Sequence, residues 1–171
     1  MTFLSDELET SRQRSRIPDV IFVATPEYMV PVILATARLS SNDVVYDLGC
    51  GDGRLIVEAA RQYCARGVGI DIDPVRVAEA RANAERAGVS ELTTFVEADM
   101  FEINVTPATV VMLYLIPSLN RRLRPKLVHE LTAGARVLSH GFDMEDWVPA
   151  ETVDFAGRLV YQWSIPESDE P

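Results

Sequence analysis

The chain reads DLGCGDGR at residues 47–54, with a glycine at every second position directly behind the apolar run VVYDL, residues 44–48. Glycine adopts left-handed backbone conformations without strain and lets another molecule approach the main chain closely. The pattern therefore predicts a tight strand-to-helix turn with a ligand lying against its backbone. The glycines concerned are Gly49, Gly51 and Gly53.

Runs typical of buried strands and of amphipathic helices alternate on both sides of this loop. Helices are expected over residues 25–39, 54–63, 74–88 and 118–131, and strands over residues 44–48, 67–71, 93–99, 109–115 and 135–142. Residues 151–165 predict a hairpin that turns at Ala156-Gly157. This alternation predicts a Rossmann-like α/β domain, with a mostly parallel seven-stranded sheet, helices on both faces and a C-terminal antiparallel hairpin.

The first expected helix contains two prolines that bear on its start. Thr25 is a candidate N-cap and Pro26 suits the first helical position. Pro31 stands where an interior amide donates, so a kink or a restart is expected there.

Acidic residues fall at the ends of the second and third strands, where open α/β sheets bind their ligands. Asp71 follows Gly51 by 20 residues, a spacing at which a carboxylate accepts both hydroxyls of a ribose. Asp99 is placed to bind an adenine edge, with Met100 or Phe101 flanking the ring. The acids and the glycine loop together predict a nucleotide site.

Residue 54 indicates which kind of nucleotide the site can bind. The dinucleotide fingerprint G-x-G-x-x-G requires glycine or alanine at this position, which holds Arg54. No G-K-[ST] sequence of a phosphate-binding loop is present either. Asp47, directly before the loop, suits a ligand that carries an ammonium group rather than a phosphate.

Three segments, VVYDLGCGDGR, GIDIDP and VEADMF, resemble the motifs of the class I S-adenosylmethionine (SAM) methyltransferases. The resemblance implies SAM as the cofactor. It implies that the glycine loop holds the methionine part of SAM, that the acid after the second strand holds the ribose, and that the third acid lies beside the adenine. The implied loop contacts are Asp47, Gly49, Cys50, Gly51 and Gly53, and the implied nucleoside contacts are Asp71, Ile72, Asp99 and Met100.

Three longer stretches of the sequence indicate a particular family among the methyltransferases. FVATPEYMV, ATVVMLYLIPSLNRRLRPKL and GARVLSHGFDMEDW resemble a small protein-lysine methyltransferase family. This family includes a broad-specificity archaeal enzyme and mitochondrial enzymes for the ATP synthase c-subunit and the adenine nucleotide carrier, and it is distantly similar to Dot1-type enzymes. Its members carry a Val-Pro-Thr-Pro motif that closes over SAM, which reads Val23-Ala24-Thr25-Pro26 here. Thr25 and Pro26 are therefore predicted SAM contacts, although Thr25 can equally be only a helix cap.

The acceptor site is predicted at the ends of the fourth and fifth strands. LYLIPSLN, residues 113–120, lacks the Asn/Asp-Pro-Pro-Tyr motif of many base-methylating enzymes, but it offers Tyr114 and Asn120 beside apolar neighbours. Such a slot suits an aliphatic amine, because apolar walls lower the pKa of a lysine and favour its reactive neutral form. Tyr114 can also be simple strand packing. His140 is a candidate base for the lysine ammonium or a structural residue.

The net charge of −10 is uneven, because residues 143–171 contain eight acids and one base, Arg158. Such a surface repels phosphate backbones and attracts cations, so we expect a protein substrate with exposed lysines and no nucleic acid. Two alternatives stay open: a methyltransferase for a small metabolite or RNA, and a SAM-binding protein without catalysis.

We expect one folded domain over residues 19–166, a flexible segment over residues 1–18 and an acidic tail over residues 167–171. The longest apolar run, residues 108–116, is nine residues long and too short to cross a bilayer. No apolar signal segment follows the N-terminus. We therefore expect a cytoplasmic monomer without a membrane partner or a metal.

Overall fold

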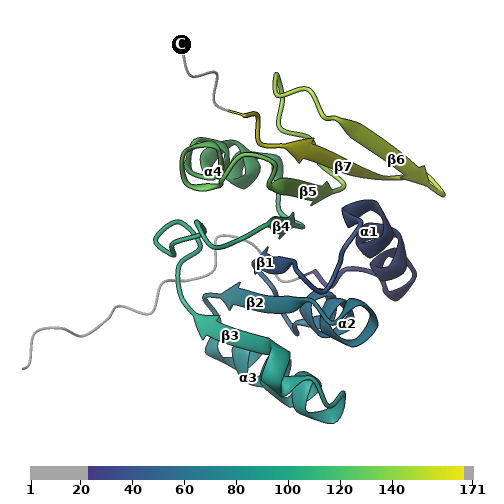
Figure 1. Ribbon diagram of the computed structural model, residues 1–171, viewed down its shortest axis with the longest axis vertical. Helices are drawn as coiled ribbons and strands as arrows, with labels where there is room; N and C mark the ends of the chain where they lie inside the picture. Colours follow the sequence, from purple (N-terminus) through teal and green to yellow (C-terminus); the bar gives the residue numbers. More distant parts are fainter. Residues whose placement is uncertain (1–22, 168–171) are drawn as a thin grey trace, which may run out of the picture.

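The computed structural model describes residues 23–167, so the expected flexible segment and residues 168–171 of the acidic tail lie outside the described residues. Its centre is a seven-stranded sheet with the strand order β3-β2-β1-β4-β5-β7-β6 (Figure 1). The strands are β1 (Val44–Leu48), β2 (Arg66–Asp71), β3 (Thr93–Glu97), β4 (Val110–Leu113), β5 (Arg136–His140), β6 (Glu151–Phe155) and β7 (Arg158–Ser164). Strands β1 to β5 are parallel, whereas β7 runs antiparallel to both β5 and β6. The predicted fold class is confirmed.

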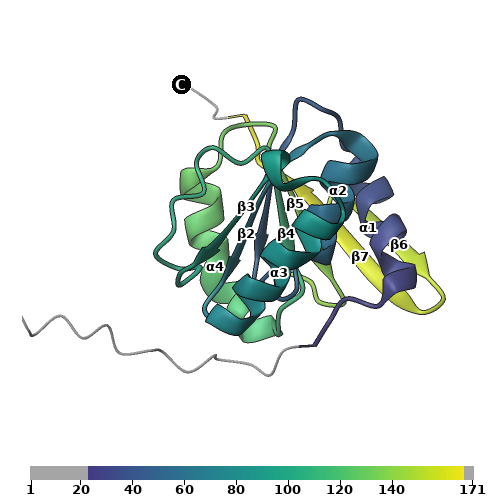
Figure 2. The same cartoon turned by 90° about the horizontal axis from the view of Figure 1, so that it is seen from below.

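Helices cover both faces of this sheet (Figure 2). They are η1 (Glu27–Met29), α1 (Val30–Ala37), α2 (Arg54–Tyr63), α3 (Pro74–Arg86), η2 (Ser90–Leu92) and α4 (Pro117–Glu130). Helices α1, α2 and α3 lie on one face, and α4 lies on the other. None of the helices within residues 23–167 is both long and apolar enough to cross a membrane.

The expected boundaries are met within one or two residues for most elements, and the first helix differs most. A 3₁₀ turn over Glu27–Met29 precedes α1, which restarts at Val30 with Pro31 in its first turn. Proline is tolerated there because the first amides of a helix have no partner within it. The prediction of Thr25 as the N-cap is wrong, because Pro26 holds that position and no side chain caps the turn.

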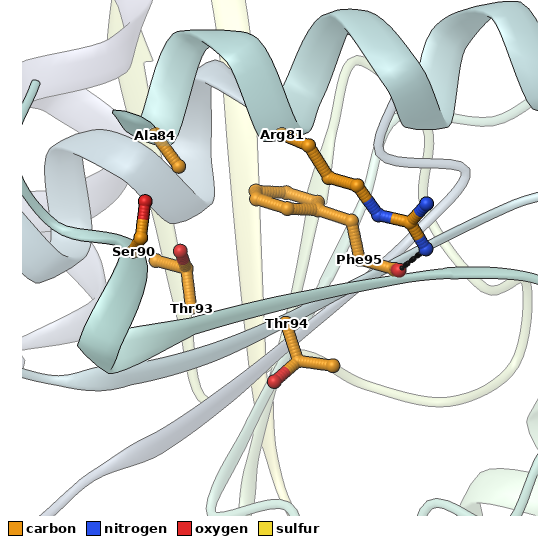
Figure 3. A pocket seen from close by; sticks show the side chains of 6 residues that line it. All are labelled: Arg81, Ala84, Ser90, Thr93, Thr94 and Phe95. Atoms are coloured by element: carbon orange, nitrogen blue, oxygen red, sulfur yellow. Dashed lines mark hydrogen bonds between the residues drawn. The ribbon is translucent and has the colours of Figure 1, made fainter. Parts of the chain in front are cut away.

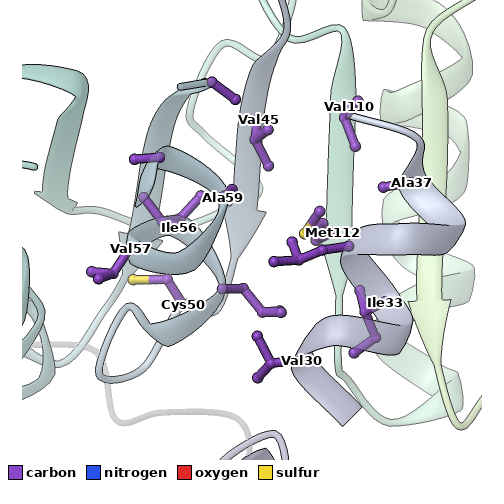
Figure 4. Packing of buried hydrophobic residues seen from close by; sticks show 14 of the residues in the cluster. Val30, Ile33, Ala37, Val45, Cys50, Ile56, Val57, Ala59, Val110 and Met112 are labelled. Carbon is purple, nitrogen blue, oxygen red and sulfur yellow. The ribbon is translucent and has the colours of Figure 1, made fainter. Parts of the chain in front are cut away.

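The core forms two layers, one on each face of the sheet. On the face of α1 and α2, Ile33 and Ile56 of the helices pack over Val45, Val110 and Met112 of the central strands (Figure 4). Because successive side chains of a strand point to opposite faces, the residues between them face α4. These central strands are apolar on both faces, as expected for a parallel sheet covered on both sides.

A buried polar cluster closes the sheet at the amino ends of β1 and β5. The Asp43 carboxylate accepts hydrogen bonds from the Thr109 hydroxyl, at 2.7 Å, and from the Arg136 guanidinium. Arg136 also donates to the carbonyl oxygens of Ala37 and Arg38, at the C-terminal end of α1. Burial raises the pKa of Asp43, but the hydrogen bonds that its carboxylate accepts, including those from Thr109 and Arg136, outweigh this effect. The pKa is therefore lowered and the ion pair with Arg136 is maintained. The cluster holds one end of α1 and leaves the opposite, carboxyl edge of the sheet for ligands.

Candidate functional site

The glycine loop lies across the carboxyl ends of β1 and β2. The amides of Gly49 and Cys50 both donate to the Ile70 carbonyl oxygen, at 2.8 and 2.9 Å. Gly49 and Gly51 have φ angles of +88° and +53°, in the left-handed region where glycine is favoured. Gly49 is exposed, so its main chain is accessible from solvent. Cys50 instead packs its sulfur into the core, where burial raises the pKa of its thiol.

Gly53 serves packing within the protein. A Cβ atom at this position would lie 2.6 Å from a ring carbon of Phe95 and 2.8 Å from the Cβ of Ala80. The absence of a side chain therefore lets the start of α2 approach β3 and α3, and the space beside Gly53 is filled by protein. The three glycines of the loop look equivalent in the sequence, but their roles differ.

Replacing Gly53 by alanine is expected to destabilise the protein by about 2–4 kcal/mol, from overpacking against Phe95 and from the left-handed backbone at φ +75°. Gly88→Ala is the matched control, since Gly88 has φ +70° and open space around its Cβ position. That control is expected to lose only about 1–2 kcal/mol. Urea denaturation of both variants measures the difference, and equal losses would show that Gly53 has no packing role.

Asp71 connects the glycine loop to the end of β2. Its Oδ2 accepts the Gly51 amide at 2.8 Å, and its Oδ1 accepts the Asp73 amide at 3.0 Å. Each carboxylate oxygen has a second lone pair, so both can still accept from a ligand hydroxyl. Ile72, the next residue, is half-buried beside it. Asp71 is thus held in place by two main-chain amides and half-open to solvent.

Asp47 is a buried carboxylate in β1, with an exposed fraction of 4%. No hydrogen bond to its side chain is formed by any residue between 23 and 167. Burial, and then the negative charges of Asp71 and Asp52, raise its pKa to about 7. A cationic ligand would stabilise the ionised form of such a buried carboxylate, because it would provide the positive charge that the neighbouring side chains lack.

Asp99 lies at the start of the segment between β3 and β4. Its Oδ1 accepts the Phe101 amide at 3.0 Å, so the carboxylate shapes the turn that follows β3. Asp99 and Met100 are both half-buried, and Met100 packs against the core on the face of α4. Both lie beside the carboxyl end of β3, at the edge of the sheet that carries Asp71.

Tyr114 and His140 stack on each other at the ends of β4 and β5. Leu113 pairs with Ser139 in the sheet, and the two rings follow directly after this pair, with centroids 4.2 Å apart and planes tilted by 32°. His140 is only 2% exposed, whereas Tyr114 is half-buried. Burial, and then the charge of Arg158, lower the pKa of His140, which favours the neutral imidazole. The geometry provides an aromatic wall with Tyr114 on its open side.

Further apolar residues follow the ends of the same two strands. A Cβ atom added at Gly141 would lie 3.8 Å from the Tyr114 ring, so the bare backbone leaves space beside the ring. Ile116 and Phe142 are large apolar side chains with exposed fractions of 40% and 39%. They follow the ends of β4 and β5 at the same edge.

Asn120 is fully buried beneath this edge. Its Nδ2 donates to the Ser139 hydroxyl at 3.0 Å and lies 3.4 Å from the Phe142 carbonyl oxygen. The side chain thereby ties α4 to β5 and to the segment after it. Asn120 is therefore closed off from solvent, unlike Tyr114, and Ser139 is likewise fully buried.

Thr25 and Pro26 lie beside the glycine loop through Arg54. Nη1 of Arg54 donates to the Thr25 carbonyl oxygen at 2.7 Å, and Thr25 is 6% exposed. In the sequence, Arg54 excludes a dinucleotide site, but its contact with Thr25 was not predicted. A signal was present, because Arg54 stands two residues after the loop aspartate Asp52, where its guanidinium can pair with that carboxylate and still donate to a neighbouring segment.

The acids at the C-terminal side are less available than their number suggests. Glu145 pairs with Arg121 at 2.8 Å, Asp146 pairs with Arg124, and Glu151 pairs with Arg38 at 2.7 Å. The excess of acids after residue 143 is therefore partly neutralised within the fold.

A separate cavity of about 300 Å³ lies between α3 and the first residues of β3 (Figure 3). It is lined by Arg81, Ala84, Ser90, Thr93, Thr94 and Phe95. Nη2 of Arg81 is engaged with the Phe95 carbonyl oxygen at 2.7 Å. Thr93 opens β3, so the cavity lies toward the amino end of this strand, away from the glycine loop.

Comparison with known proteins places this site in a family. The model of the ANTKMT methyltransferase domain matches residues 47–151, which include the glycine loop, Asp71, Asp99 and both rings. The chain belongs to this methyltransferase family. It is 43% identical to the protein-lysine N-methyltransferase of Saccharolobus islandicus (strain REY15A) over 158 residues, which cover 90% of this chain and 98% of the relative.

The chain is also similar to a mouse enzyme and to a bacterial protein of known structure. The adenine nucleotide translocase lysine N-methyltransferase of Mus musculus is 32% identical, over 80% of this chain and 63% of the mouse protein. A crystal structure from Salinibacter ruber, described as an RNA methyltransferase in complex with S-adenosyl-L-homocysteine, is 50% identical with a TM-score of 0.84. The similarity covers 87% of this chain and 97% of the Salinibacter chain. The predicted family and the class I methyltransferase fold are confirmed.

Proposed function

We propose that the chain transfers a methyl group from SAM to the ε-amine of lysine in protein substrates. One observation carries the proposal: the aromatic wall of Tyr114 and His140 stands at the same sheet edge as the glycine loop, in a chain 43% identical to a protein-lysine N-methyltransferase. SAM supplies the methyl group on a sulfonium leaving group, so the protein has mainly to align the acceptor and exclude water.

The residues present fit SAM. Gly49 offers open main chain, and Asp47 is a buried carboxylate that lacks a donor among residues 23–167, which suits the ammonium of the methionine part. Asp71 is held with lone pairs free for ribose hydroxyls. We assign the adenine side to Asp99 and Met100, with Ile72 beside the ribose, and the methionine side to Thr25 and Pro26. The Salinibacter relative is described in complex with S-adenosyl-L-homocysteine, which supports SAM as the cofactor.

The acceptor site has the chemistry that a lysine requires. A lysine is protonated at neutral pH and attacks only as the free amine, so apolar surroundings that lower its pKa favour the reaction. Tyr114, Gly141 and Phe142 provide such surroundings. We propose Tyr114 as the residue that contacts the lysine side chain.

His140 and Asn120 fit positioning roles. His140 is buried under the Tyr114 ring, and Asn120 is closed off from solvent under β5. A base must reach the proton that it accepts. The burial of His140 therefore favours support of the Tyr114 ring over proton transfer.

RNA is the second candidate acceptor, because the Salinibacter relative is described as an RNA methyltransferase. RNA binding requires cationic groups that contact phosphates. On α4, which begins beside the acceptor site, the arginines are engaged: Arg121 and Arg124 pair with acids, and Arg122 lies over the Phe101 ring at 4.1 Å. Together with the net charge of −10, these contacts favour a protein acceptor.

The experiment that tests the proposal offers radiolabelled SAM together with lysine-rich proteins and with total RNA, in separate and mixed reactions. Label is expected on lysine after protein hydrolysis. Label confined to RNA would overturn the lysine assignment, and binding of SAM without any transfer would indicate a non-catalytic SAM-binding protein. The cytoplasmic location and the monomeric state stay predictions, which cell fractionation and sedimentation address.

Replacing Tyr114 by alanine is expected to lower kcat for lysine methylation by roughly 10- to 100-fold, because the amine loses an aromatic contact and its alignment. The dissociation constant for SAM, measured by calorimetry, is expected to change less than three-fold. Tyr114→Phe keeps the ring and is expected to retain most activity. Equal losses of SAM binding and transfer would indicate that the tyrosine is structural packing.

A further inference from the structure

Arg54 joins two parts of the molecule that the sequence separates. Its guanidinium lies between Asp52 in the glycine loop and Thr25 in the segment that precedes α1. Nε and Nη2 of Arg54 contact the two Asp52 carboxylate oxygens at 3.0 and 2.6 Å, which is a bidentate pair. Nη1 donates to the Thr25 carbonyl oxygen at 2.7 Å. Both partners are therefore held by one planar group.

The environment makes this arrangement more than a surface ion pair. The Arg54 and Asp52 side chains are 29% and 21% exposed, so the pair is partly shielded from water. Burial raises the pKa of Asp52, but the hydrogen bond and charge of Arg54 outweigh it and keep the carboxylate ionised. Asp52 is held at its main chain as well, since its carbonyl oxygen accepts Nδ2 of Asn83 on α3 at 2.8 Å. The loop end of the bridge is therefore fixed.

The other end holds the segment of residues 23–29, here called the lid segment. Arg136 secures the C-terminal end of α1 at the far edge of the sheet. Arg54 secures the opposite side, where the lid segment passes the glycine loop. It reaches a carbonyl oxygen, so the contact depends on the backbone position and not on the side chain of residue 25.

We propose that Arg54 is a positioning residue that clamps the lid segment onto the glycine loop and so retains SAM in its site. The inference rests on the proposed SAM site, and it adds a role for a residue outside the predicted SAM contacts. The fork geometry explains why arginine suits the position: it binds the two Asp52 oxygens and still has a donor for the Thr25 carbonyl.

The direction in which SAM affinity changes when Arg54 is replaced distinguishes a clamp from a purely electrostatic effect of its charge. SAM is cationic overall, so removal of the Arg54 charge alone would strengthen its binding to a site that contains Asp47 and Asp71. Loss of a clamp has the opposite effect. Arg54→Met is expected to weaken SAM binding roughly 10- to 100-fold, in line with loss of a charged hydrogen bond, and to raise the KM for SAM far more than it changes kcat.

The matched control is Arg61→Met on the same helix. Arg61 makes a bidentate pair with Glu58, at 3.1 and 2.9 Å, without contact to the loop or the lid segment. This variant is expected to bind SAM like the unmodified protein. Arg54→Lys, which keeps the charge but loses the fork, is expected to fall between the two. Thermal melting confirms that each variant is folded.

Hydrogen exchange with S-adenosyl-L-homocysteine distinguishes failure of the clamp from failure of the site. In the unmodified protein, residues 49–53 and the lid segment are both expected to gain protection. In Arg54→Met at saturating ligand, residues 49–53 gain protection and the lid segment does not. Equal protection of the lid segment in both proteins, or tighter SAM binding by the variant, would overturn the clamp. Absence of protection at residues 49–53 in the unmodified protein would instead overturn the SAM site.

Discussion

Replacing Asp71 by alanine is expected to weaken SAM binding by at least about 100-fold, because the variant lacks the carboxylate that we propose for the two ribose hydroxyls and also lacks the anchor of the glycine loop. The anchor is the hydrogen bond from the Gly51 amide to Oδ2, at 2.8 Å. Without it, the loop keeps its bonds from Gly49 and Cys50 to the Ile70 carbonyl, so the fold persists while the ligand surface shifts. Isothermal calorimetry with SAM measures the loss.

Asp73→Ala provides the matched control. Asp73 lies two residues further on and caps α3 by accepting the Val75 amide at 2.9 Å. Its removal is expected to cost about 1 kcal/mol of stability without a comparable loss of SAM affinity. If Asp71→Ala, shown to be folded, binds SAM as tightly as Asp73→Ala does, the site assignment is wrong.

Most of the fold could be predicted from local sequence patterns. The run Val44–Leu48 and the helix Arg54–Tyr63 were predicted with their observed bounds, because β-branched runs, amphipathic periodicity and glycine turns depend on nearby residues. The hairpin turn at Ala156-Gly157 is confirmed for the same reason, since both residues have positive φ. The predicted N-cap at Thr25 is wrong, because the turn begins one residue later than expected and Pro26 is its N-cap.

The site was less predictable, because its contacts join distant parts of the chain. Gly53 and Gly49 share one motif, but Phe95 of β3 fills the space beside Gly53. The stacking of Tyr114 on His140 depends on the register of β4 with β5, which no local pattern reports. The burial of Asn120 was not predictable either, because it depends on the packing of α4 against β5, where Nδ2 donates to the Ser139 hydroxyl.

The SAM affinity is expected to increase with pH, because of Asp47. Its pKa is about 7 in the free protein, so the carboxyl is mostly protonated at pH 5 and would have to ionise to form the proposed pair with the ammonium of SAM. The dissociation constant for SAM is therefore expected to fall by up to about ten-fold per pH unit between pH 5 and pH 7. Above about pH 7.7 the α-amino group of the ligand itself begins to lose its proton, which limits the useful range. Calorimetry across pH 5–7 measures the slope.

Asp47→Asn removes this titration and separates binding from stability. The variant is expected to bind SAM at least about ten-fold more weakly at pH 7, with an affinity that no longer varies with pH. The folded pKa lies above the ordinary value of 3.8, so the unmodified protein loses stability as pH rises from about 4 to 7. The cost approaches about 1.4 kcal/mol per unit of pKa difference.

Asp47→Asn is therefore expected to be more stable than the unmodified protein at pH 7.5, and the difference is expected to shrink toward pH 4. Urea denaturation at both pH values checks this. A variant that is less stable at pH 7.5 would mean that Asp47 is satisfied within the fold and is not kept for a cation. The opposite result, a gain of stability with a loss of SAM affinity, is what a carboxylate reserved for a ligand requires, because such a group destabilises the free protein and is compensated only on binding.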